Sequence, residues 1–142
     1  KQARGLRNNN PLNIIKSKSQ IWLGETNLGG ETHFCQFSSM QYGFRAALKL
    51  LRTYYSKYGC ITIRQIIVDG HLRRRIRWRR ISRRYAGSPR WVPMSPLPPM
   101  KSETKIVWCE LVLAMASVEC GLSADNRDTL RYSVAKGWNM LY

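Results

Sequence analysis

A glutamate at the end of an apolar helix is the best candidate in this chain for acid chemistry. Glu119 lies in the run Ala116–Gly121, two residues before a glycine that can end the helix. The helix dipole and the loss of water there both disfavour an anion, so the sequence predicts a raised pKa for Glu119. A raised pKa is what a general acid for glycoside cleavage requires. The alternative is an ordinary helix-end glutamate that points into water.

Aromatic and asparagine side chains add chemistry that suits sugars. Trp and Tyr rings stack on pyranose faces, and Asn amides hydrogen-bond to hydroxyl and acetamido groups. Trp22, next to Gly24 and Glu25, is the best stacking candidate, and a core anchor is the equal alternative. Three consecutive asparagines followed by Pro11 suit neither a helix interior nor a sheet. They predict a polar, pinned loop.

Hydrophobic spacing predicts mainly helices to position these side chains. Two short extended pieces, Ile21–Gly24 and His33–Phe37, are separated by Asn27–Gly30, which favours a hairpin or an open loop. Helices are predicted from Ser38 or Ser39 to Gly59, from Thr62 to near Gly70, from about Ser102 to Cys120, and through Leu130 to Trp138. Residues 71–100, rich first in arginine and then in proline, are predicted to be irregular. The fold class is therefore α+β and mainly helical.

Length and composition favour one soluble domain across residues 1–142. No apolar run approaches the roughly 18 residues that span a bilayer, and the polar N-terminal residues do not resemble a signal peptide. The net charge of +16 predicts an anionic partner: nucleic acid, an anionic membrane surface or an acidic wall polymer. Nine of the arginines fall between Arg73 and Arg90, a segment without any acid.

The cysteines show no metal or redox pattern. There is no Cys-x-x-Cys pair and no companion histidine spacing, which argues against a zinc site and a redox dithiol. We therefore expect free thiols, mostly buried, and no metal or cofactor, at the positions Cys35, Cys60, Cys109 and Cys120.

The first half of the chain resembles a family of small phage and prophage proteins described as virion structural proteins. The family pattern begins R-G-I-R-N-N-N-P-G-N-I and closes with A-M-x-x-x-E-N-G. The residues that carry the resemblance are Arg4–Ile14, Trp22–Gly24, Phe34–Ala46, Tyr55–Gly59 and Thr62–Ile67, with Ala114–Gly121 resembling the closing motif. The resemblance implies a virion location, or the bacterial cytoplasm before release, with other virion proteins as partners.

The pattern is also similar, more distantly, to flagellar-type glucosaminidases of the lysozyme superfamily, if a circular permutation is supposed. That analogy implies a small lysozyme-like domain that binds or cleaves peptidoglycan as a glycosidase or lytic transglycosylase. Glu119 would be the general acid, with Glu31 or Glu25 as a second carboxylate. The residues that would line the saccharide cleft are Arg7, Asn8, Asn9, Asn10, Asn13 and Trp22.

The sequence departs from the family pattern in two places, one residue and one segment. Leu12 stands where the family has glycine, which predicts strain if that position needs a positive φ. After Asp69 the family has a tryptophan, then A-P-P, an asparagine-rich piece and an acidic helix, none of which is visible.

Back-translating Leu72 to Arg84 with chosen codons and starting one base earlier yields A-P-P, Asn-Pro and E-A-Y-I in the family's order. We therefore hypothesise that roughly His71 to Pro98 is frameshifted, so that much of the positive charge would be accidental.

Three functions compete on this sequence. The first is a phage-derived, virion-associated protein with a lysozyme-like domain acting on peptidoglycan. The second is a virion structural or assembly protein without catalysis. The third is a basic nucleic-acid-binding protein whose phosphate contacts would be Arg73, Arg74, Arg75, Arg77, Arg79 and Arg80.

Overall fold

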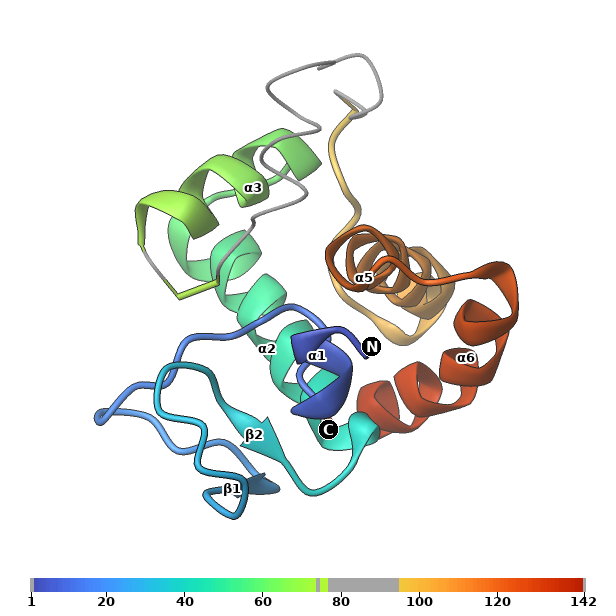
Figure 1. The fold of residues 1–142 in the computed structure, drawn as a ribbon. Helices are drawn as coiled ribbons and strands as arrows, with labels where there is room; N and C mark the ends of the chain where they lie inside the picture. The colour runs from blue at the N-terminus through green and yellow to red at the C-terminus, as the bar shows by residue number, and fades with distance from the viewer. Residues whose placement is uncertain (1, 74, 77–94, 142) are drawn as a thin grey trace.

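Helix α2 (Met40–Tyr58) is the central element of the fold, and helices from both halves of the chain pack against it (Figure 1). The computed structural model describes residues 2–73, 75–76 and 95–141. Within these residues the other elements, in chain order, are α1 (Arg4–Arg7), β1 (Glu25–Thr26), β2 (Gln36–Phe37), α3 (Ile63–Leu72), the 3₁₀ helix η2 (Ser102–Thr104), α5 (Lys105–Cys120) and α6 (Ala124–Asn139). No helix in the described part of the chain is long and apolar enough to cross a bilayer.

The core lies where α2 meets its neighbours. Helix α6 packs along α2, α5 packs on both, and α3 and β2 contact α2 elsewhere. The fully buried side chains of α2 recur at helical spacing, so that one face of the helix is apolar. They are Phe44, Ala46, Ala47, Leu48, Leu51 and Tyr54.

The predicted helices are confirmed, with small differences at their ends. Helix α2 ends at Gly59 and α5 ends at Gly121, and both glycines adopt the left-handed conformation that closes a helix. Helix α3 begins after Thr62, whose hydroxyl accepts a hydrogen bond from the Gln65 amide at 3.1 Å.

The first predicted strand is wrong in its position. Trp22–Gly24 forms a turn, in which the Glu25 amide donates to the Trp22 carbonyl and Gly24 has a φ of +81°. The strand therefore begins only at Glu25, which pairs antiparallel with Phe37. Of the second piece, Phe34 forms an isolated bridge with Ile15 instead of joining β2.

Two further segments differ from the sequence prediction. The opening residues Arg4–Arg7 form one helical turn before the asparagines. Helix α3 continues to Leu72, so the predicted irregular segment begins later than residue 71. Ile76 is buried and bridges Ile14, which shows that the chain still contributes to the core there. Most of the segment proposed to be frameshifted, residues 77–94, lies outside the described residues.

Replacing Gly43 in α2 by alanine is expected to destabilise the protein, although alanine favours helices. A Cβ at this position would collide with the Asn9 carbonyl oxygen and approach Pro11 Cδ to 2.8 Å. Such overpacking costs about 1–3 kcal/mol. Denaturant unfolding should show this loss for Gly43→Ala, whereas Ser56→Ala, on the exposed side of the same helix, should be neutral or slightly stabilising. A stabilised Gly43→Ala would contradict the close approach of α2 to the asparagine loop.

Candidate functional site

The asparagine loop, residues 8–13, is held by hydrogen bonds to neighbouring segments. It is not exposed to solvent. Asn8 follows the last residue of α1, and Asn9 and Asn13 adopt φ values of +52° and +55°. Asparagine tolerates this left-handed region better than most residues. The strain predicted at Leu12 is absent, because the positive φ falls on the asparagines and Leu12 is fully buried in the core.

Asn10 fastens the loop from inside. It is completely buried, and its side-chain nitrogen donates to the carbonyl oxygens of Ile14 at 3.0 Å and Cys35 at 2.9 Å. Its side-chain oxygen accepts from the Ile14 amide at 2.9 Å. The amide therefore pairs with backbone groups of two segments that are far apart in sequence, as a strand would.

The other two asparagines hold the loop to the β2 region. Asn9 donates from its side chain to the Phe37 carbonyl at 3.0 Å, and the Phe37 amide donates to the Asn8 carbonyl at 2.9 Å. The Asn8 side chain donates to Glu31 Oε1 at 3.1 Å. Each of the three side chains thus makes an internal hydrogen bond, and a role for them in saccharide binding stays a prediction.

Glu31 is held as an anion. Arg4 donates two hydrogen bonds to its carboxylate, both 2.9 Å long, and the amides of His33 and Phe34 donate two more. Despite partial burial, the Arg4 hydrogen bonds and the other donors hold the pKa of Glu31 far below its usual range. A carboxylate in this state is not a proton donor at neutral pH. The geometry favours a structural role for Glu31, which joins α1 to the loop before β2.

Glu119 and the asparagine loop lie in neighbouring parts of the structure. Glu119 is only 6% exposed and sits in the last turn of α5, next to Cys120. The Cys120 thiol donates to the Pro11 carbonyl at 3.6 Å. A Cβ on Gly5 would lie 2.9 Å from both the Cys120 sulfur and the Asn10 carbonyl oxygen, so the lack of a side chain there lets α1, the loop and α5 meet. The end of α5 is therefore fixed against the loop.

The remaining predicted site residues are scattered. Arg7 is exposed, and the buried side-chain oxygen of Asn13 has no hydrogen-bond partner. Trp22 is 6% exposed and belongs to the hydrophobic core. This position agrees with the alternative interpretation of Trp22 as a core anchor. Of the arginines predicted to contact phosphates, Arg73 and Arg75 are described and the other four lie outside the described residues.

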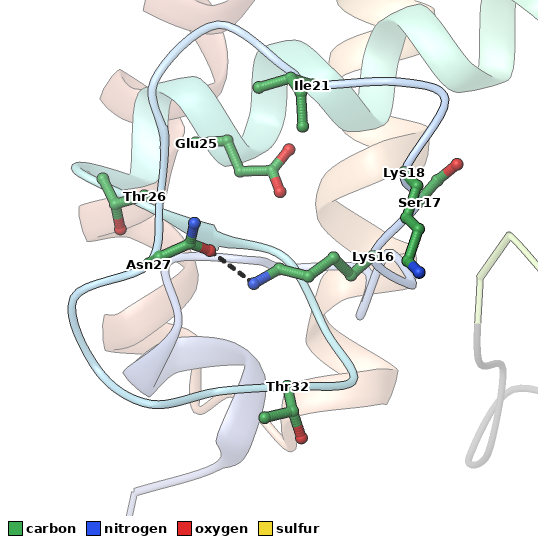
Figure 2. A pocket seen from close by; sticks show the side chains of 8 residues that line it. All are labelled: Lys16, Ser17, Lys18, Ile21, Glu25, Thr26, Asn27 and Thr32. Atoms are coloured by element: carbon green, nitrogen blue, oxygen red, sulfur yellow. Dashed lines mark hydrogen bonds between the residues drawn. The ribbon is translucent and has the colours of Figure 1, made fainter.

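Glu25, the alternative second carboxylate, lines a cavity of about 330 Å³ between the loops that flank β1 (Figure 2). Its Oε1 accepts from the Trp22 amide at 3.0 Å. Figure 2 shows Lys16 crossing this space to Asn27, to whose side-chain oxygen it donates at 2.6 Å. Neither Glu119 nor the asparagine loop lines this cavity, so Glu25 and Glu119 do not share it.

The thiols agree with the sequence prediction in part. None of the four cysteines, all of which lie in the described part of the chain, forms a disulfide; Cys35, Cys60 and Cys120 are buried, whereas Cys109 is half-buried. Burial raises the pKa of Cys35 to about 12 and that of Cys60 to about 11. These thiols therefore stay protonated and unreactive at neutral pH.

Part of this chain is similar to Protein P5 of Pseudoalteromonas phage PM2. The two are 46% identical over 67 residues, which make up 46% of this chain and 42% of Protein P5. The matched part thus spans less than half the length of that relative. No family model matches the chain. The predicted resemblance to phage proteins is confirmed over this part, whereas the likeness to lysozymes stays a prediction.

Removing the Asn10 amide is expected to be severely destabilising. Asn10→Ala would leave the Ile14 amide and the Cys35 carbonyl without partners in the interior, at about 1–3 kcal/mol for each buried unsatisfied group, whereas the Ile14 carbonyl keeps its hydrogen bond from the Cys35 amide. The free energy of unfolding from denaturant titration measures this loss. Asn126→Ala, at an exposed position of α6, is the matched control and should change stability by less than about 0.5 kcal/mol. Equal effects of the two substitutions would refute the role of Asn10.

The stability of the protein is expected to fall in acid partly through Glu31. Because the folded-state pKa of Glu31 is depressed, its contribution is present above the unfolded-state value and is lost as the pH falls from about 5 towards 2. Unfolding measured across this range should show a shallower acid slope for Glu31→Gln than for the wild type. Glu103→Gln, at an exposed site, should keep the wild-type slope. Parallel slopes for all three proteins would contradict the assignment.

Proposed function

We propose that this chain is a phage-derived, virion-associated protein whose mainly helical domain binds or cleaves the glycan strands of peptidoglycan. The phage part of this proposal rests on the similarity to Protein P5. The glycan part rests on one observation, the burial of Glu119 at the end of α5 beside the asparagine loop.

The position of Glu119 suits a proton donor. It is the most deeply buried acidic residue of the described part of the chain, and it lies at the negative end of an apolar helix. A carboxyl group shielded from water at that end of a helix favours its neutral form. In the proposed reaction Glu119 gives its proton to the glycosidic oxygen as the bond to the anomeric carbon breaks, a water molecule adds to that carbon, and the proton that the water loses restores the acid.

The asparagine loop supports this chemistry through position. Its backbone is pinned by Asn10 on one side and by Cys120 on the other, which sets where the end of α5 lies. Arg7 is the predicted substrate-binding residue of this region that remains exposed. In this proposal the buried asparagines shape the site and Arg7 is available to an acetamido or carboxylate group of the glycan.

A non-catalytic virion structural protein is the second candidate function. The observation that favours it is the use of Asn8, Asn9, Asn10 and Glu31 in internal hydrogen bonds, because such a network serves stability without any substrate.

Glu119→Gln separates the two candidates. If Glu119 is the general acid, release of soluble fragments from purified peptidoglycan should fall by about 100-fold or more, because the amide cannot donate the proton to the leaving oxygen. Glu103→Gln is the matched control at an exposed position and should keep full activity. Unchanged activity in folded Glu119→Gln would refute the proposed role. Absence of any release by the wild type, with the protein found in purified phage particles, would favour the structural candidate.

A further inference from the structure

Helix α5 is apolar on its outward side, where the surface helix of a globular protein usually carries polar side chains. Ile106 is 77% exposed and Val107 is 43% exposed, and Ala114, two turns after Val107, is exposed as well. Between Ile106 and Val118 the sequence has one charged residue, Glu110. Exposed apolar surface of this kind marks a place where another surface binds.

A groove of about 200 Å³ lies beside Ile106, between α5 and α6. The residues that each helix contributes recur at helical spacing, so two stripes of side chains form its walls. From α5 they are Lys105, Ile106, Cys109, Glu110 and Leu113, and from α6 they are Arg131, Val134 and Ala135. An apolar protrusion and a mainly apolar hollow therefore lie side by side on one face of the molecule.

The charged side chains around this groove have both signs. Glu110 of α5 pairs with Arg131 of α6, and both side chains are about half exposed. Arg131 also pairs with Asp128 at 3.3 Å, and Lys105 donates to the Asn139 side chain at 3.1 Å. Two copies of a chain with a net charge of +16 repel each other wherever their positive surfaces meet. That repulsion is small at this face, because its acids and bases are balanced.

We propose that α5 and α6 form the interface of a symmetric dimer, in which Ile106 of each copy fills the groove of the other. Two-fold symmetry brings the same patch of both copies together, so the patch must be complementary to itself. A protrusion beside a hollow, and an acid beside a base, meet this condition. In the dimer Glu110 of each copy lies near Arg131 of the other. An anionic lipid surface or a nucleic acid would instead require an excess of positive charge.

Sedimentation equilibrium of the whole chain tests the proposal, since the wild type should pass from monomer to dimer as its concentration rises. Ile106→Asp should weaken this association by about 100-fold or more, because the symmetry repeats the loss of a buried aliphatic side chain in both copies. Leu28→Asp is the matched control and should dimerise as the wild type does. Leu28 is 93% exposed in the loop between β1 and β2, on the side of the molecule away from α5 and α6 (Figure 1).

Charge reversal identifies the partner as a second copy of this chain. Glu110→Arg and Arg131→Glu should each weaken dimerisation by about tenfold, because each places like charges opposite one another across the interface. An equimolar mixture of the two variants should regain most of the wild-type association. Only the mixed dimer restores opposite charges at both contacts.

Four outcomes overturn the proposal. They are a wild type that stays monomeric at millimolar concentration, a folded Ile106→Asp that dimerises like the wild type, a Leu28→Asp that is weakened as much as Ile106→Asp, and a mixture that associates no more tightly than its components. If the monomeric wild type sediments with phosphatidylglycerol vesicles and Ile106→Asp does not, the occupant is a lipid surface. None of these outcomes depends on Glu119, which lies at the other end of α5.

Discussion

The buried side-chain amide of Asn10 is the contact on which the N-terminal half of the fold depends. Its hydrogen bonds satisfy backbone groups of Ile14 and Cys35 that lie outside the regular sheet. Each strand of the sheet in the described residues is only two residues long. Buried backbone groups need partners, and the asparagine side-chain amide supplies two donor hydrogens and an acceptor oxygen, which here pair with two carbonyls and one amide. The loop is consequently rigid without being part of a helix or a strand.

Several close approaches follow from that rigid loop. Gly43 of α2 and Gly5 of α1 lie against its backbone, where a side chain would collide, and Cys120 brings the end of α5 to Pro11. The loop thus joins elements from opposite ends of the sequence. Glu119 lies in the same last turn of α5 as Cys120 and is buried there.

The positively charged side chains occupy two different kinds of position in the structure. Arg4 is paired with Glu31 and stabilises the fold. Lys57, Arg73 and Arg75 border one cavity, and Arg73 also pairs with Asp69. Ile76, directly after Arg75, is buried in the core, so the start of the arginine-rich segment is part of the packed structure.

The sequence by itself determined the four longer helices of the described residues, the ends of α2 and α5, and the resemblance to phage proteins. Periodic apolar residues and the glycines at 59 and 121 are local signals, and local signals are sufficient for helices whose hydrogen bonds are also local. Only the tertiary structure decided that the asparagines face inward, that Glu31 is locked by Arg4, and that Trp22 and Tyr54 meet cations from beyond α3. Those contacts join residues far apart in the chain, and their partners depend on how helices pack, which no spacing along the sequence specifies.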